Sequence, residues 1–194
     1  MTVTWANWDF DPNWKFTEEE EVLQPAHFGL RSSRRDMGFT ALSVYSIRSM
    51  DSTPFYAWKK DPTPDVTAVM AKELASLVEN WFPVRGSDWI VTTPPQGASK
   101  YKTRDGVYPA GMLGAATAAL LNLDYVTTLV RQTDKKWHGK YQAMAQNDFV
   151  VTARPPSLAI VIDDMLTSGT TMGLSVKALR MVGVPTMQFV WVGI

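Results

Sequence analysis

The feature that most constrains the fold is an apolar run that ends in two adjacent carboxylates. Leu158 to Ile162 is almost continuously apolar, which is typical of a parallel strand buried on both faces. Asp163 and Asp164 follow where this predicted strand ends, and open α/β sheets bind ligands at that edge. Two neighbouring carboxylates at such a place can accept hydrogen bonds from two neighbouring sugar hydroxyls. The run therefore predicts a parallel sheet with a polar site at its carboxyl edge.

A loop rich in hydroxyl groups comes next and opens a predicted helix over residues 169 to 181. It combines a glycine with backbone N–H groups at a helix N-terminus, which is how many proteins hold a phosphate. A ribose 5-phosphate fits the whole segment, with its diol on the acids and its phosphate in the loop. The alternative is an ordinary strand–turn–helix with polar capping residues, but capping alone does not require two consecutive acids. The loop residues are Thr167, Ser168, Gly169, Thr170 and Thr171.

Strands and helices alternate along most of the chain. Residues 39 to 48 alternate apolar and polar side chains, which predicts a half-buried strand in a hairpin or at a sheet edge. A helix is predicted to begin at Thr63-Pro64-Asp65 and to stop at Pro83. Its residues at helical spacing are Val66, Val69, Met70, Leu74, Leu77, Val78 and Trp81. Further strands are predicted at 89–93, 125–130, 158–162 and 187–192, and further helices at 106–121 and 139–146.

This alternation predicts an α/β fold, with a doubly wound and mostly parallel sheet formed by residues 37 to 194. Residues 1 to 36 are predicted to be an irregular arm, with Trp5, Trp8 and Trp14 close together. Those rings can dock on the domain or on a second subunit, which leaves a homodimer open. They can also form a stacking platform for bases, although the acidic residues 18 to 21 disfavour a nucleic-acid backbone.

Composition excludes several classes of protein. The 194 residues include 19 basic and 19 acidic side chains, so no global positive charge points to nucleic acid. There is no cysteine, which excludes disulfides and thiolate metal sites, and two histidines make a histidine-rich metal centre a poor fit. The first ten residues lack a signal pattern, and no apolar stretch is long enough to span a bilayer. We therefore expect a cytoplasmic protein without a membrane partner.

Residues 160 to 172 closely resemble the signature of type I phosphoribosyltransferases for phosphoribosyl pyrophosphate (PRPP). Strand, acid pair and Thr/Ser-Gly-Thr loop occur in the same order. The resemblance implies a phosphoribosyltransferase fold and transfer of a phosphoribosyl group from PRPP to a nitrogenous base, with Mg²⁺ as cofactor and release of pyrophosphate. It also implies that Asp163 and Asp164 contact the ribose hydroxyls and that residues 167 to 171 hold the 5-phosphate.

A second loop follows the predicted strand at 89–93. In the family that it resembles, the corresponding loop holds pyrophosphate through backbone amides. Pro94 and Pro95 have no N–H to donate, so this role would fall to Gln96, Gly97, Ala98 and Ser99. Basic residues come next and can neutralise a departing pyrophosphate, or can simply form a solvated loop. They are Lys100, Lys102 and Arg104.

Residues 92 to 113 resemble more closely the competence protein F (ComF)-like branch, which carries a Pro-x-Pro loop and an Arg-Gly-Phe-Asn-Gln segment. Here Arg104-Asp105-Gly106-Val107-Tyr108 inserts an acid and lacks the Asn-Gln. The cysteine zinc module of that branch is absent too. A second hypothesis is therefore a catalytically silent regulator or competence-type adaptor that binds PRPP or a nucleotide, with single-stranded DNA as a partner through residues 100–104 or 135–140. The acceptor base is not predicted, and its pocket is expected in residues 1–60 or 132–156.

Overall fold

Eight strands and four helices make up the described part of this computed structural model, which comprises residues 26–29, 40–46, 51–83, 86, 88–95, 108–131, 149–152, 156–167 and 169–193. The helices are α1 (Thr53–Lys60), α2 (Pro64–Trp81), α3 (Pro109–Leu121) and α4 (Thr170–Met181). The strands are β1 (Ala26–Gly29), β2 (Thr40–Ser46), β3 (Trp89–Thr92), β4 (Asp124–Tyr125), β5 (Leu129–Arg131), β6 (Phe149–Val151), β7 (Leu158–Leu166) and β8 (Thr186–Gly193).

Six of the strands form one twisted sheet in the order β1-β2-β8-β7-β3-β4. Every neighbouring pair from β2 to β4 is parallel, and only β1 at the edge runs antiparallel. β5 and β6 form a separate antiparallel pair. The longest strands, β7 and β8, lie in the middle and pair from Ala159↔Thr186 to Leu166↔Gly193. Parallel strands in this position are covered on both faces, which is why β7 reads as a continuous apolar run.

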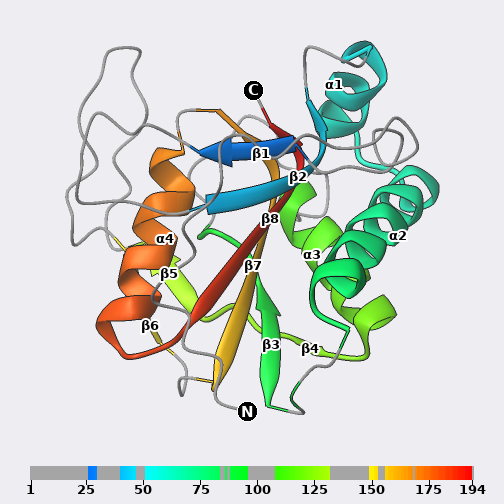
Figure 1. Cartoon of the computed structure of the whole chain (residues 1–194). Helices are drawn as coiled ribbons and strands as arrows, with labels where there is room; N and C mark the ends of the chain where they lie inside the picture. Colours follow the sequence, from blue (N-terminus) through cyan, green and yellow to red (C-terminus); the bar gives the residue numbers. More distant parts are fainter. Residues whose placement is uncertain are drawn as a thin grey trace, which may run out of the picture.

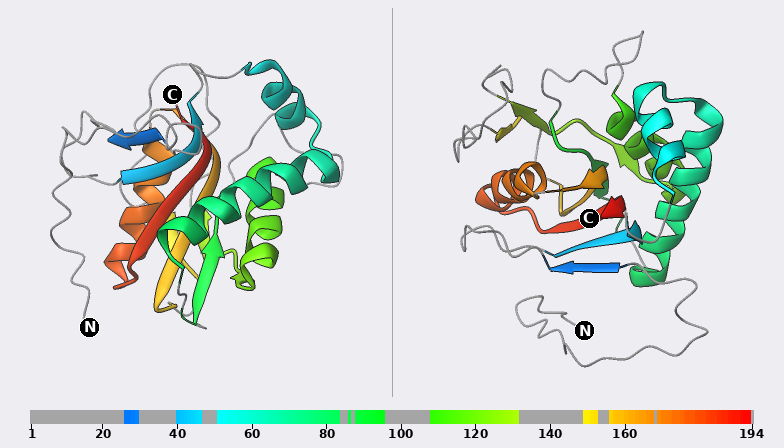
Figure 2. Two further views of the ribbon diagram at one scale, coloured as in Figure 1. Left: turned by 45° about the vertical axis from the view of Figure 1, so that its right-hand side comes forward. Right: turned by 90° about the horizontal axis from the view of Figure 1, so that it is seen from above.

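The helices lie on both faces of this sheet, as a doubly wound fold requires. Figure 1 shows α4 on one side and α2 and α3 on the other, and Figure 2 shows the same separation from above. The core is divided accordingly. Ile160 and Ile162 pack with buried residues of α2 and α3, whereas Ala159 and Val161 pack with those of α4. The predicted doubly wound, mostly parallel α/β sheet is confirmed.

Three details of the sequence prediction are wrong. Residues 26–29 form β1, although they fall in the segment that we expected to be irregular. The strand predicted at 125–130 is split into β4 and β5, which belong to different sheets. On α2, Val66 and Val69 are exposed, and Thr67, Ala71 and Ala75 are buried in their place. Small side chains let α2 pack closely, and hydrophobicity alone does not reveal that preference. The helix predicted at 139–146 lies outside the described residues.

Helix α3 packs tightly against the end of β3 at Gly114. A Cβ atom at this position would lie 2.6 Å from the Thr93 Cγ2 and 3.0 Å from the Tyr125 Cε2. Thr93 cannot easily turn away, because its hydroxyl is 3.0 Å from the Tyr125 hydroxyl and its β-branched side chain has few rotamers. The absence of a side chain at Gly114 therefore sets how closely α3 approaches the strand.

We expect Gly114→Ala to lower the free energy of unfolding by about 1–3 kcal/mol through overpacking. Alanine in a helix interior normally stabilises by about 0.5–1 kcal/mol relative to glycine, so a net loss would report the close contact. Urea unfolding of Gly114→Ala, Thr93→Ser and the double variant gives a double-mutant cycle. Thr93→Ser keeps the hydroxyl and removes Cγ2, so the double variant should recover part of the stability that Gly114→Ala loses. Strictly additive changes in the free energy of unfolding would contradict this packing.

Candidate functional site

The sheet has a switch point between β3 and β7. From the carboxyl end of β3 the chain passes through α3 to β4 on one side, and from β7 it passes through α4 to β8 on the other. Ligands of open α/β sheets bind in the crevice outside such a point. Thr92 pairs with Val161, so the chain leaves β3 through Pro94 and Pro95 at about the level of the acid pair. The topology alone therefore directs attention to Asp163 and Asp164.

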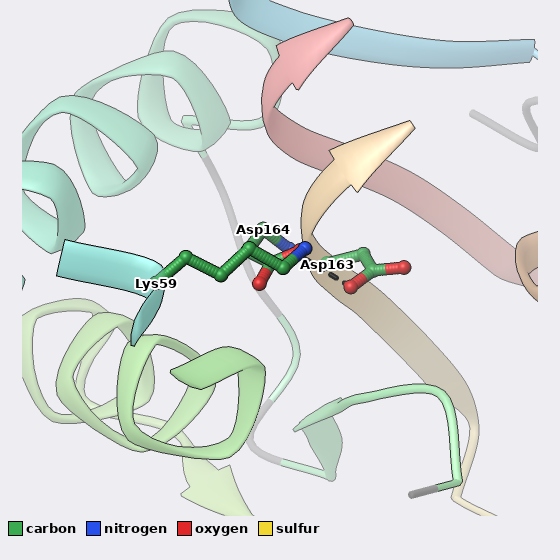
Figure 3. A network of polar contacts seen from close by, with 3 residues as sticks. All are labelled: Lys59, Asp163 and Asp164. Carbon is green, nitrogen blue, oxygen red and sulfur yellow. Dashed lines mark hydrogen bonds and ion pairs between the residues drawn. The ribbon is translucent and has the colours of Figure 1, made fainter. Parts of the chain in front are cut away.

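The acid pair lies inside β7 and not after it. The strand continues to Leu166 because Met165 and Leu166 still pair with Val192 and Gly193 of β8. Side chains of successive strand residues point to opposite faces. Figure 3 shows Asp164 on one side of the strand, toward α1, and Asp163 on the other. The expectation that the two acids follow the strand is thus wrong, and the structure separates their carboxyl groups by face.

Lys59 of α1 contacts one of the two acids. Its Nζ lies 2.8 Å from the Asp164 Oδ1 and donates a hydrogen bond to it (Figure 3). The two side chains are only 18% and 7% exposed, so this ion pair is largely removed from water. The Asp163 Oδ1 accepts a hydrogen bond of 2.9 Å from the backbone N–H of Asp164. One acid therefore has a cationic partner and the other has a main-chain partner.

Aromatic packing holds α1 in the position that makes this contact. Phe55 and Trp58 are its buried residues, and the Phe55 ring stacks on Trp191 of β8 at 5.4 Å. The Trp58 indole N–H donates to the Thr67 hydroxyl of α2 at 2.9 Å. The Lys59 Nζ also lies 5.7 Å from the centre of the Phe55 ring, one helical turn earlier, within the range of a cation–π interaction.

Trp191 is fixed in turn by a carboxylate of α2. The Trp191 indole N–H donates to Glu73 Oε2 at 2.7 Å, and the Tyr45 hydroxyl donates to Oε1 at the same distance. Tyr45 and Trp191 also meet edge to face at 5.0 Å. The Glu73 carboxylate raises the pKa of Tyr45 by accepting its hydrogen bond. This network ties α2, β2 and β8 together behind Phe55.

The electrostatics of the acid pair differ from those of surface carboxyls. Burial raises the pKa of Asp163 to about 8, the charge of Asp164 adds to the rise, and the charge of Lys59 opposes it. Burial also raises the pKa of Asp164, again against the charge and the hydrogen bond of Lys59. Two carboxyls and one ammonium group in a poorly solvated place are most stable when the carboxyls together hold one proton. Since Lys59 contacts Asp164, Asp163 is the better place for that proton.

The loop after β7 leads directly into α4. Gly169 is the N-cap residue, with φ of 71° and ψ of −1°, a left-handed conformation that favours glycine. It is buried, and as glycine it has no side chain with which to cap the helix. The first-turn backbone N–H groups and the positive end of the helix dipole therefore face this loop without an N-cap side chain. Thr167 is exposed, and Thr170 and Thr171 are half-buried.

The structure thus brings together part of the predicted site. Asp163, Asp164, Thr167, Gly169, Thr170 and Thr171 all lie at the carboxyl end of β7 or the start of α4. Other predicted residues, for the phosphate and pyrophosphate, lie outside the described part of the chain, and their roles stay predictions. These are Ser168, Gln96, Gly97, Ala98, Ser99, Lys100, Lys102 and Arg104.

Sequence reasoning missed Lys59 and the helix that carries it. A local signal existed, because Asp51-Ser52-Thr53-Pro54 is a helix start and Phe55 and Trp58 are spaced for one buried face. The Asp51 carboxylate accepts a hydrogen bond from the Thr53 N–H at this start. The contact with Asp164, however, spans 105 residues and has no local signal.

The described part of the chain contains neither a metal-binding cluster nor a membrane-spanning helix. No group of three or more histidine, aspartate or glutamate side chains is placed to hold a metal ion within that part of the chain. Among the same residues, no helix is long and apolar enough to cross a membrane.

Comparison with known proteins finds likenesses only at the level of three-dimensional structure. No protein-family model matches the sequence. No curated protein matches it significantly either.

Solved structures similar to this one include phosphoribosyltransferases. Adenine phosphoribosyltransferase from Saccharomyces cerevisiae, in complex with adenine and an imino-altritol bisphosphate, is 14% identical over 91% of this chain and 87% of that chain, with a TM-score of 0.43. Another adenine phosphoribosyltransferase is 16% identical over 91% and 88%, with a TM-score of 0.48. Orotate phosphoribosyltransferase from Aeropyrum pernix is 15% identical over 87% and 72%, with a TM-score of 0.35.

At these identities, the likeness concerns the fold alone. The resemblance to the ComF-like branch stays a prediction from the sequence. The structure is thus a doubly wound α/β fold that is similar to adenine and orotate phosphoribosyltransferases.

Proposed function

We propose that this protein is a Mg²⁺-dependent phosphoribosyltransferase that binds PRPP and transfers its phosphoribosyl group to a nitrogenous base. One observation carries the proposal. Two adjacent acids, Asp163 half-buried and Asp164 buried, lie at the carboxyl end of β7 beside the switch point of the sheet, and the strand leads through Gly169 into the N-terminus of α4. In a ribose 5-phosphate, one sugar ring separates the diol from the phosphate. The acid pair can therefore bind the diol while the nearby helix N-terminus binds the phosphate.

The ribose would lie across the end of β7. Asp164 accepts a hydrogen bond readily because Lys59 stabilises its negative charge, whereas Asp163 can donate one as long as it holds a proton. The 5-phosphate would take the N–H groups of the first turn of α4, together with the hydroxyls of residues 167 to 171. Asp163 lies on the same face of β7 as Val161, and Val161 packs with α4. Asp163 can therefore contact the ligand from the side of α4.

The reaction would begin with loss of pyrophosphate from C1 of the ribose. The C1–O bond breaks with its electron pair on the pyrophosphate oxygen, and C1 becomes oxocarbenium-like. A ring nitrogen of the base then forms the new bond to C1 and loses its proton to water or to pyrophosphate. Positioning of the ribose and stabilisation of the developing charges would provide most of the catalysis.

Magnesium fits the donor chemistry of the site in a limited way. Asp163 and Asp164 are oxygen donors of the kind that this ion takes, but Lys59 already compensates the charge of Asp164. The ion would therefore be held mainly by pyrophosphate oxygens, ribose hydroxyls and water. When bound, it would neutralise part of the pyrophosphate charge. The protein would hold the rest of the pyrophosphate through residues 96–99, with Lys100, Lys102 or Arg104.

Calorimetric titration of Mg²⁺·PRPP into the wild-type protein and into Asp163→Asn/Asp164→Asn tests the ribose assignment. We expect the double variant to bind at least about a hundredfold more weakly, because two hydrogen bonds involving charged or strongly polarised groups are lost. The single variant Asp163→Asn keeps the Lys59–Asp164 ion pair, so it controls for the loss of that ion pair in the double variant. A double variant that is folded by circular dichroism and binds as tightly as the wild-type protein would refute the assignment.

A pyrophosphate-release screen over purines, pyrimidines and pyridine carboxylates then identifies the acceptor. Acid-dependent binding of PRPP without release by any base would favour the alternative, a regulator or competence-type adaptor that keeps the pocket without transfer. The adaptor would bind single-stranded DNA in a salt-dependent manner through residues 100–104 or 135–140. Absence of PRPP binding by the folded wild-type protein would contradict both the transferase and a regulator that binds PRPP, and would leave nucleic acid and protein partners to be tested.

A further inference from the structure

The contact between Lys59 and Asp164 has a consequence for the site that does not follow from the acid pair alone. Lys59 comes from α1, whereas the acids come from β7, and 105 residues separate them. The contact is short, at 2.8 Å, and Asp164 is only 5% exposed. A carboxylate so removed from water needs a charged partner to remain ionised. Among the described residues, the charged groups that contact Asp164 or lie beside it in β7 are Lys59 and Asp163.

The packing of neighbouring residues of α1 fixes the position of Lys59. Phe55, one turn before it, is 2% exposed and stacks on Trp191, and Trp58, directly before it, is 3% exposed and bonds to Thr67. These two rings fix the side of α1 from which Lys59 leaves. Lys59 and Lys60 also lie in the last turn of α1, where the helix dipole favours a positive charge.

We propose that Lys59 is a positioning residue of the site: it holds the Asp164 carboxylate charged and oriented at the end of β7, where Asp164 binds the ligand. This inference rests on the proposed function, because the ligand that Asp164 would bind is the ribose of PRPP. Lys59 acts through Asp164 and not by contact with the reacting atoms. The two acids consequently play different parts, Asp164 as the ionised acceptor and Asp163 as the partner that can carry a proton.

The geometry also explains why the ammonium group need not leave when a ligand enters. Lys59 occupies Oδ1 of Asp164, and a carboxylate has lone pairs for about four hydrogen bonds on its two oxygens. A ribose hydroxyl can therefore share the carboxylate with Lys59. If Lys59 instead blocked the ribose, its removal would tighten binding, so the sign of the effect separates the two arrangements.

The test compares Lys59→Met, Lys59→Arg and the matched control Lys60→Met. Lys60 belongs to the same turn of α1 and is exposed, so Lys60→Met removes the same charge without the contact to Asp164. We expect Lys59→Met to weaken Mg²⁺·PRPP binding by about tenfold or more, as for loss of a charge-assisted interaction. Lys59→Arg should bind within about threefold of the wild-type protein, and Lys60→Met should be unchanged. Equal or tighter binding by folded Lys59→Met would overturn the proposal.

A second readout does not need PRPP. In protein with ¹³C-labelled aspartate carboxyls, the Asp164 resonance is assigned by its absence from Asp164→Asn and followed at neutral pH. The carboxyl should be ionised in the wild-type protein and in Lys59→Arg, and protonated in Lys59→Met. An ionised Asp164 in Lys59→Met would overturn the inference even if PRPP binding were affected. If Lys59→Met does not fold, Lys59→Gln gives the same comparison, because it is uncharged and can still hydrogen-bond.

The two readouts distinguish failure of the inference from failure of the proposed function. A wild-type protein that does not bind PRPP would refute the function, and the carboxyl resonance would still decide whether Lys59 holds the charge of Asp164. A protein that binds PRPP through its acids, with Lys59→Met equal to wild type, would keep the function and refute the role of Lys59.

Discussion

Replacing Phe55 by alanine should lower the free energy of unfolding by about 3–5 kcal/mol, the range for a large aromatic side chain removed from a core. Phe55 is 2% exposed and is among the largest fully buried side chains, and its ring contacts Trp191 and Trp58. Among the described residues, the stacking of Phe55 on Trp191 joins α1 to β8, so the cavity would open where α1 meets the sheet. Urea unfolding followed by far-UV circular dichroism measures the loss.

Tyr56→Ala is the matched control for this prediction. Tyr56 is the next aromatic residue on the same helix, but it is 45% exposed and only meets the edge of the Phe55 ring, at 5.5 Å. Its replacement should cost no more than about 0.5–1.5 kcal/mol, the usual range for one aromatic pair. Equal losses in the two variants would show that the Phe55 ring does not anchor α1. Because Lys59 follows on this helix, Phe55→Ala should also weaken the effect of Lys59 on Asp164.

Replacing Asp163 by asparagine should stabilise the protein increasingly as the pH rises. The raised pKa of Asp163, about 8 in the folded protein against 3.8 for an ordinary aspartate, means that the folded state binds a proton which the unfolded chain releases. Between these values, the unfolded state holds fewer protons, so the stability of the wild-type protein falls as the pH rises and levels off above pH 8. Asparagine is neutral throughout and avoids this loss.

The difference in unfolding free energy between Asp163→Asn and the wild-type protein should therefore grow between about pH 4 and pH 8. We expect it to increase by at least about 1.4 kcal/mol, the equivalent of one pKa unit, since the side chain is partly exposed and water reduces the full effect. Denaturant unfolding at several pH values measures it. Asp124→Asn removes an exposed carboxyl and serves as the control. A difference that stays constant across this range would show that Asp163 is ionised in the folded protein.

Much of the fold followed from local patterns. The apolar run of β7, the helical spacing with Pro64 at the start of α2, and the glycine before α4 each depend on neighbours in sequence. Errors arose where packing decides. Val66 and Val69 look like core residues but are exposed, because α2 turns small side chains such as Ala71 and Ala75 toward its neighbours. The split between β4 and β5 likewise depends on which strands lie beside them.

The candidate site divides in the same way. Local sequence predicted two acids at the end of a buried strand and a hydroxyl-rich loop with a glycine that opens a helix, because these residues are adjacent in the chain. Tertiary structure decided how the acids are used. Pairing with β8 extends β7 through them, so that alternation along the strand sends Asp163 and Asp164 to opposite faces. Packing of Phe55 and Trp58 then brings Lys59 to Asp164, a contact between distant segments that depends on the assembled core and not on any local pattern.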